Sequence, residues 1–384
     1  MVYMDYNATT PCDERVFEEM SPYFSKEFGN PSSIYGLARN SRKALEIARE
    51  RVAELLDCKT EEIFFTSGGT EADNWAIIGT AFGMREKGKH IITSSIEHHA
   101  VLNTCKFLEK MGYEITYLPV DRYGVVDVDA LKKAIRKDTI LVTIMAANNE
   151  IGTVQPIKEI AEIVKEKGIY FHTDAVQVAG KVPVSVKDMN VDMLSLSGHK
   201  FYGPKGVGAL YVRKGVKLIP FLYGGGQEKG KRAGTENVAG IVGLGKAAEI
   251  AISEMAEEAE KIRKLRDELE NGIKEKIPEI IINGHTEKRL YNTLNLCIKY
   301  IEGESILLNL DFEGICASSG SACTSGSLEP SHVLLAIGIP PEVAHSSIRF
   351  SLGKHNKRED VLKVLDVLPG IVEKLRKMSP FWKQ

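Results

Sequence analysis

Short apolar runs alternate with longer segments of helical periodicity between Glu61 and Gly215. This alternation predicts an α/β domain in which helices cover both faces of a mostly parallel sheet. Ligands of such sheets bind beyond the carboxyl ends of the strands, so polar residues that follow a predicted strand become candidates for function. The predicted strands are residues 63–66, 91–94, 114–119, 140–146, 169–173, 193–197 and 207–212, with helices that include 71–87, 101–111 and 157–167.

The flanking segments show a different pattern. Apolar side chains in residues 33–56 recur at the spacing of one amphipathic helix, and residues 239–277 predict one or two long helices that end before Pro278. A long helix after the sheet is a natural connector to a second domain. The remainder of the chain fits a small α+β domain, with strands at 280–282, 293–298, 315–318 and 348–351 and helices at 304–310 and 358–377.

Composition and charge narrow the class of protein. The chain has 384 residues, of which 43% are hydrophobic and 27% charged, as in ordinary globular proteins. A formal net charge of −2 gives no electrostatic footprint for nucleic acid or an anionic membrane, so we expect neither partner. The six cysteines are scattered without zinc spacing, and the N-terminus lacks the pattern of a signal peptide. We therefore expect free thiols in a reducing cytoplasm.

Two charged residues follow neighbouring predicted strands. Lys200 comes after strand 193–197 among small hydroxyl residues and a histidine, and Asp174 directly follows strand 169–173. The separation of 200 − 174 = 26 residues suits one strand, one crossover and a second parallel strand. Such a lysine is typical of one that binds pyridoxal phosphate as a Schiff base, and the carboxylate can hold the protonated pyridine nitrogen. A lysine after a strand is by itself more often a solvated surface residue, so the prediction depends on the pair.

Two glycine-containing segments are candidates for phosphate binding. Residues 67–71 follow a strand and open a helix, where glycines let the backbone approach an anion and free N–H groups point at it, and Thr70 adds a hydroxyl. Residues 224–237 are glycine-rich and basic, and place Thr235 before the long helix. The alternative interpretations are an ordinary strand-to-helix turn and a flexible surface loop.

Planar polar side chains follow two other strands. His98 and His99 come after strand 91–94, where an imidazole can stack on a pyridine ring or transfer a proton. Adjacent histidines also suggest a metal site, but no third ligand is obvious. Asn149 and Gln177 can hydrogen-bond a phenolate oxygen without carrying charge, although an Asn-Asn-Glu turn is otherwise ordinary loop chemistry.

Two residues in the C-terminal part suggest chemistry of their own. Cys323 lies near the centre of small, polar residues, which suits a thiol that reaches a substrate and then a partner. The alternative is a linker with an incidental cysteine, since structural cysteines are normally buried among apolar neighbours. Arg349 lies inside an apolar strand and needs an anionic partner, either a substrate carboxylate held by two hydrogen bonds or a structural carboxylate.

In combination and in order, these motifs resemble the cysteine desulfurase family, the NifS/IscS group of pyridoxal-phosphate enzymes. The likeness covers nearly the whole chain, from residues 3–11 to residues 346–353, and the segment 318–326 is similar to the group with the longer cysteine loop. It implies a homodimer of pyridoxal-phosphate fold type I, which is the fold of aspartate aminotransferase, with a mostly parallel seven-stranded sheet. The implied large, cofactor-binding domain is 16–257, and the small domain combines 1–15 with 258–384 and carries the cysteine loop at about 318–330.

The resemblance also implies residue roles. Lys200 binds the cofactor covalently, Asp174 holds its ring nitrogen, His99 stacks on the ring and Gln177 binds the phenolate oxygen. Asn149 contacts both the cofactor and the substrate. The implied phosphate ligands are Gly69, Thr70, Ser197, His199 and, from the other subunit, Thr235, and the implied substrate contacts are Asn7, Asn149 and Arg349. Relatives often have alanine at position 69, a difference expected to matter little because the backbone makes the contact.

The implied activity is that of a sulfurtransferase. L-cysteine gives L-alanine and a persulfide on Cys323, which supplies an iron–sulfur scaffold protein or another acceptor for cluster assembly and other thio-cofactors. Cys323, Lys200 and His99 are the implied catalytic residues; whether Cys323 transiently binds a cluster stays open, and no firm metal site is predicted. The alternatives are an aminotransferase or selenocysteine lyase on the same scaffold, and a non-catalytic protein that holds clusters. The last of these predicts clustered cysteines, which the sequence lacks.

Overall fold

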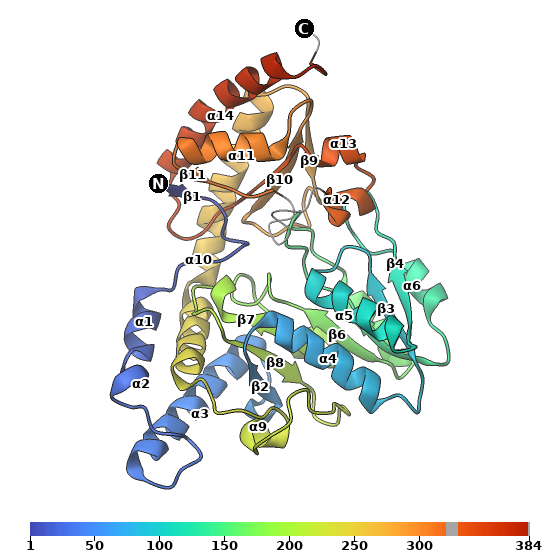
Figure 1. Cartoon of the computed structure of the whole chain (residues 1–384), viewed down its shortest axis with the longest axis vertical. Coiled ribbons are helices and arrows are strands. Elements are labelled where there is room, and N and C mark those ends of the chain that lie inside the picture. Colours follow the sequence, from blue (N-terminus) through green and yellow to red (C-terminus); the bar gives the residue numbers. More distant parts are fainter. Residues whose placement is uncertain (320–328, 383–384) are drawn as a thin grey trace.

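The computed structural model describes residues 1–319 and 329–382, so Cys323, within 320–328, lies outside the described residues. A seven-stranded sheet of order β2-β8-β7-β6-β5-β3-β4 occupies the larger part of the molecule (Figure 1). Within it β8 runs antiparallel to β2 and β7, and the other paired strands are parallel, which confirms the predicted mostly parallel sheet. The strands are β2 (Ile63–Thr66), β3 (His90–Ser94), β4 (Glu114–Leu118), β5 (Thr139–Thr143), β6 (Tyr170–Asp174), β7 (Met193–Ser197) and β8 (Gly208–Val212).

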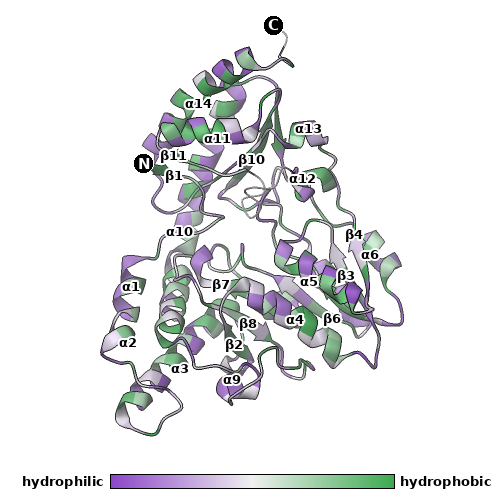
Figure 2. Cartoon of the chain, viewed as in Figure 1, coloured by the Kyte–Doolittle hydropathy of each residue, from purple (hydrophilic) through white to green (hydrophobic). Residues whose placement is uncertain are grey.

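Helices cover both faces of this sheet because successive strand residues point to opposite sides. Ile91, Leu141 and Met193 belong to the core beneath α4 and α5, whereas their neighbours Ile92 and Val142 belong to the core beneath α3, α7 and α10. Figure 2 shows hydrophobic strands at the centre and mixed hydropathy along the covering helices. These helices are α3 (Gly36–Leu56), α4 (Gly69–Gly83), α5 (His99–Lys110), α7 (Ile157–Glu166) and α10 (Val238–Lys276).

A second group of elements has its own apolar core. The antiparallel strands β9 (Ile280–Asn283), β10 (Thr293–Ile298) and β12 (Ser347–Ser351) pack with α11 (Gly303–Phe312) and α14 (Arg358–Met378). The short strands β1 (Val2–Tyr3) and β11 (Ile315–Cys316) pair in parallel, which brings the N-terminus to this group. The small helices here are α12 (His332–Ala336) and α13 (Pro341–Ala344).

Helix α10 joins the two groups (Figure 1). It is one helix of 39 residues, which settles the choice between one and two long helices. Leu244 and Ala248 in its first half enter the core of the large sheet, and Ile262 and Leu269 in its second half enter the other core. The exact division into 16–257 and 1–15 with 258–384 stays a prediction.

Several bounds differ from the pattern-based ones. Strand β5 ends three residues before the predicted end, and the Met145 N–H there donates to the side chain of Glu97. Strand β11 is also shorter, since Ser318 pairs instead with Arg349 in an isolated bridge. Short helices escaped prediction because one or two turns carry too little periodicity: α1 (Glu14–Met20), α2 (Pro22–Ser25), α6 (Val128–Ala134), α8 (Val186–Met189), α9 (Gln227–Gly230) and the 3-10 helices η1 (Thr60–Glu62) and η2 (Gly198–Lys200).

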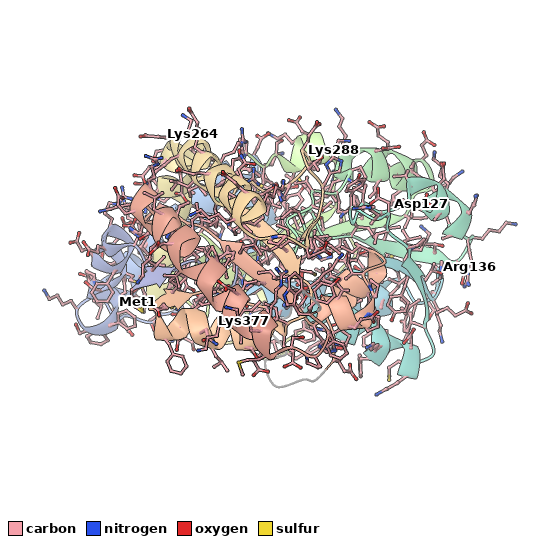
Figure 3. All side chains as sticks on the ribbon, turned by 90° about the horizontal axis from the view of Figure 1, so that it is seen from above. Met1, Asp127, Arg136, Lys264, Lys288 and Lys377 are labelled. Atoms are coloured by element: carbon pink, nitrogen blue, oxygen red, sulfur yellow. The ribbon has the colours of Figure 1, made fainter. Side chains whose placement is uncertain are left out.

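Charged side chains lie on the outside of the molecule. Seen from the side of α14, the labelled Arg136 and Lys264 project at its margin (Figure 3). Within residues 1–319 and 329–382, no helix has the length and apolar character needed to span a bilayer.

Candidate functional site

One cavity of about 410 Å³ gathers almost all of the predicted site residues. Strands β6 and β7 are parallel neighbours in which Asp174 stands opposite Ser195, so both strands end at the same edge of the sheet. Asp174 is the last residue of β6, and η2 then carries the chain from β7 to Lys200. The predicted residues that line the cavity are Asn7, Gly69, Thr70, His99, Asn149, Asp174, Gln177, Ser197, His199, Lys200 and Arg349.

Asp174 is a buried carboxylate at the base of this cavity. Its Oδ1 accepts a hydrogen bond of 2.8 Å from the main-chain N–H of Val176. Burial raises the pKa of Asp174 to about 6, and that same N–H and the Lys200 ammonium oppose the rise. Because a buried carboxylate is unfavourable without a compensating cation, a protonated pyridine nitrogen here would relieve the cost. The position therefore fits the ring nitrogen of the implied cofactor.

Lys200 is held over the cavity by the N-terminal segment. Its ammonium donates to the main-chain oxygens of Asn7 (2.6 Å) and Ala8 (2.7 Å), residues about 190 positions away in the chain. Both acceptors are carbonyl groups rather than carboxylates. Lys200 also lines the cavity, so these contacts hold its ammonium beside the space where a ligand would lie.

The N-terminus of α4 forms the predicted phosphate cradle. The N-cap residue, Gly68, lacks a side chain that could satisfy the first N–H groups of this 15-residue helix. Strand β8 approaches closely here, since a Cβ on Gly208 would lie 2.8 Å from the Cα of Gly68. Thr70, Ser197 and His199 line the space beside this helix end. Free N–H groups, two hydroxyls and an imidazole form a donor set that suits a phosphate.

The structure corrects the expectation for position 69. A Cβ on Gly69 would lie 2.6 Å from Cγ2 of Val176, closer than carbon atoms approach without a shift. An alanine here therefore requires Val176 to move, even though the phosphate contact is made by the backbone. The sequence could not show this contact, because it joins a helix start and a loop that are far apart in the chain.

The two adjacent histidines both line the cavity, but they have different contacts. His98 is the N-cap of α5, and its Nδ1 accepts a hydrogen bond from the Ala100 N–H. His99 lines the cavity, and its ring centroid lies 4.9 Å from that of His332 at an angle of 49°. Within the described ranges, no group of three or more His, Cys, Asp or Glu side chains is placed to hold a metal ion.

The adjacent residues Asn148 and Asn149 also have different roles. The Asn148 side chain closes the turn, because its Oδ1 accepts the N–H groups of Glu150 and Ile151. Asn149 lines the cavity, and its carbonyl accepts from the Arg349 guanidinium at 3.0 Å. Both interpretations of this turn therefore hold: Asn148 stabilises the loop, and Asn149 lines the cavity.

Arg349 has the structural carboxylate partner considered from the sequence, and one of its donors lacks a partner in the part of the chain that the structure describes. Its Nη2 forms a 2.7 Å ion pair with Asp5, which is the structural partner that a buried arginine needs. Its buried Nε has no hydrogen-bond partner among the described residues, although the side chain lines the cavity. A guanidinium with an unmet donor, on a residue that lines a cavity, suits an anionic ligand such as a carboxylate.

Two predicted residues are not part of this cavity. Thr235 is exposed and does not line it, and its implied role in another subunit stays a prediction. Cys323 lies outside the described residues, but both flanks of its segment are anchored at the cavity. Ser318 exchanges main-chain hydrogen bonds with Arg349, and Ser331 donates to the buried Glu150 at 2.5 Å.

Sequence patterns missed several residues around the site. Asp73 lines the cavity from α4, and its pKa is raised by burial and by Asp174. The predicted helix begins at residue 71, whereas α4 begins at Gly69 and so places Asp73 one turn after it. Asp5, Lys181 and His332 reach the site through long-range packing, for which the local sequence contains no indication.

Comparisons with known proteins agree with this geometry. The family model of the class-V aminotransferases matches residues 2–364. Cysteine desulfurase IscS of Methanosarcina thermophila is 62% identical over 99% of this chain and 94% of that protein. Cysteine desulfurase IscS 1 of Archaeoglobus fulgidus is 51% identical over 100% of both.

Solved structures show the same likeness. A NifS-like protein has a TM-score of 0.92 and 43% identity, covering 97% of this chain and 100% of its own. A structure described as SspA in complex with cysteine has a TM-score of 0.82 and 41% identity, covering 93% of this chain and 100% of its own. The chain therefore belongs to the class-V aminotransferase family and, within it, to the cysteine desulfurases of the NifS/IscS group.

Proposed function

We propose that this protein is a pyridoxal-phosphate-dependent cysteine desulfurase that converts L-cysteine to L-alanine and retains the sulfur as a persulfide on Cys323. The observation that carries the proposal is one cavity that combines a lysine ammonium, a buried carboxylate, a helix N-terminus and a buried arginine. Relatives named cysteine desulfurase that match the whole chain, and a neighbour described in complex with cysteine, support this substrate.

The residues present fit the cofactor. Lys200 would hold it covalently and Asp174 would face its ring nitrogen, with His99 over the ring and Gln177 beside the phenolate oxygen. Gly69, Thr70, Ser197 and His199 would hold its phosphate. When bound, pyridoxal phosphate supplies an electron sink for the electron pair left on the substrate α-carbon.

The chain itself then binds the substrate and moves its proton. The Arg349 guanidinium holds the substrate carboxylate, and Asn7 and Asn149 border the same space. As a free amine, Lys200 Nζ would remove the α-proton as a general base and return a proton to the carbon skeleton. The Asp174 carboxylate would pair with a protonated ring nitrogen and so keep that nitrogen protonated.

Sulfur transfer is assigned to Cys323. Its thiolate attacks the substrate sulfur, so that an S–S bond forms as the carbon–sulfur bond breaks. The carbon is reduced and leaves as alanine after protonation, while the sulfur becomes the outer atom of the persulfide, and no external oxidant is needed. Cys323 is five residues from Ser318, a distance that spans at most about 18 Å of extended chain. Since Ser318 is bonded to Arg349, this reach starts at the cavity wall.

We also propose the assembly and the setting. The exposure of Thr235 supports a homodimer in which this residue completes the phosphate site of the partner subunit. An iron–sulfur scaffold protein or another thiol acceptor would take the sulfur. The free cysteines Cys12, Cys58, Cys105, Cys297 and Cys316 support a reducing cytoplasm.

The deciding experiment is to add L-cysteine to the purified yellow protein and to measure alanine and the mass of the Cys323 peptide. One added sulfur atom on this peptide, with alanine formed, is expected. Cys323→Ser should keep the cofactor absorbance and lose the sulfur adduct. Bound cofactor with neither adduct nor alanine would reject the proposal in favour of an aminotransferase or lyase, which amine exchange with a keto acid would detect.

A further inference from the structure

Lys181 is a buried lysine that borders the site without lining the cavity. Its side chain is 6% exposed, and it follows Gln177 by four residues in an irregular helical turn. Its ammonium donates to Gln177 Oε1 at 2.8 Å and to Asn7 Oδ1 at 3.2 Å. A lysine is rarely buried at this depth, because desolvation of the ammonium is costly unless its hydrogen bonds are made. Both of these hydrogen-bond acceptors are side-chain amides of residues assigned to the site, which suggests a role for Lys181 there.

The chemistry of the ammonium determines how these amides are oriented. A lysine ammonium only donates hydrogen bonds, so the oxygen of each amide must face it. The Gln177 nitrogen then points the other way, where one N–H donates to the Asn7 main-chain oxygen at 2.9 Å. The second N–H is left for the cavity, which Gln177 lines. With the amide flipped, an acceptor oxygen would face that space instead.

Asn7 is fixed by the same contact. Its Oδ1 also accepts from Asn292 at 2.9 Å, and its Nδ2 donates to Thr293 at 2.8 Å. The main-chain oxygen of Asn7 in turn accepts from both Gln177 and Lys200. Lys181 therefore supports two amides that share one hydrogen-bond network with the lysine of the site.

We propose that Lys181 is a positioning residue that holds the Gln177 amide with its nitrogen toward the cofactor phenolate oxygen, and that it supports Lys200 through Asn7. The inference rests on the proposed function, since it assigns an N–H donor to the cofactor side of Gln177. Without Lys181 only the contact to the Asn7 main-chain oxygen sets the orientation of the amide, so the donor to the phenolate oxygen is held less firmly.

The positive charge of Lys181 affects the protonation of the lysine–cofactor linkage in the same direction as the Gln177 donor does. The charged groups that face it are Lys200 on η2, Arg349 on β12 and Glu258 on α10. Burial lowers the pKa of Lys181 to about 7, Lys200 and Arg349 add to this effect, and Glu258 opposes it. While Lys181 is protonated, its charge favours the deprotonated form of the lysine–cofactor linkage, as does a donor to the phenolate oxygen.

The test is the pH titration of the absorbance of the cofactor-loaded enzyme, for wild type and Lys181→Met. Loss of the donor and of the charge should raise the midpoint by about one pH unit. In a Gln177→Ala background the same substitution should produce a clearly smaller shift, because the amide through which Lys181 acts is gone. Lys165→Met is the matched control, since Lys165 is a partly buried lysine on α7 that pairs with Asp192 away from the cavity. Its midpoint should equal that of wild type.

Either an unchanged midpoint in Lys181→Met or an equal shift with and without Gln177 would overturn the inference. If Lys181→Met does not fold, Lys181→Gln is titrated against the same two criteria. Failure of the proposed function is a distinct result, because wild-type protein would then bind no cofactor or release no alanine.

Discussion

Gly69→Ala tests how tightly the phosphate cradle is packed against the loop after Asp174. The new methyl group would lie 2.6 Å from Cγ2 of Val176 and 3.7 Å from Cβ of Ser197. Only the first of these contacts is too close. Val176 also donates its main-chain N–H to Asp174, so a shift of Val176 is transmitted to this carboxylate.

Two opposing contributions determine the change in the free energy of unfolding of Gly69→Ala. One methyl group forced into a packed region costs about 1–3 kcal/mol. Replacement of glycine in a helical conformation returns about 0.4–1 kcal/mol by reducing the freedom of the unfolded chain. The cost exceeds the gain because Val176 is β-branched and has few alternative rotamers. We expect a net loss of about 1 kcal/mol in the free energy of unfolding, and cofactor affinity lower by up to about tenfold.

The assay combines urea unfolding with cofactor titration for wild type, Gly69→Ala, Val176→Ala and the double variant. Val176→Ala removes the atom that clashes, so adding Gly69→Ala to it should no longer destabilise the protein. Gly370→Ala is the matched control, since a Cβ on this glycine of α14 meets nothing within 4 Å, and it should be stabilising. If Gly69→Ala alone were as stable as wild type and bound cofactor equally well, the packing argument would be refuted.

Two further predictions concern charges in the cavity. Arg349→Lys is expected to raise the KM for L-cysteine by about tenfold or more with a smaller change in kcat, because an ammonium cannot replace the guanidinium fork. Steady-state measurement of alanine formation gives both constants. A fall in kcat at constant KM would contradict the assignment. In the cofactor-free protein, Asp174→Asn is expected to be stabilising at pH 8 by up to about 3 kcal/mol. The sign follows from a folded-state pKa raised from 3.8 to about 6, which makes the wild type lose stability as the pH rises through that interval. Urea unfolding at pH 8 and pH 4 should show this advantage at the higher pH and not at the lower, and an equal difference at both would falsify the assignment.

Local sequence determined the elements that carry the chemistry. Apolar runs located β2 and β7 at their observed bounds, because a buried strand needs apolar side chains on both faces whatever its neighbours are. The positions of Asp174 and Lys200 after adjacent strands followed from the same pattern, since parallel strands end at one edge of the sheet. The resemblance then supplied the roles of these residues, and Cys323 and Thr235 keep theirs as proposals.

Tertiary structure alone decided which groups surround these residues. The direction of β8 was not predictable, because an apolar strand has the same pattern in either direction. Asp5 pairs with Arg349 across 344 residues, and Asn7 bonds Thr293 across 286. Lys181 could be recognised as buried only once Asn7 was in place above it. Such contacts depend on chain closure over long distances, whereas sequence patterns report the preferences of a few neighbouring residues.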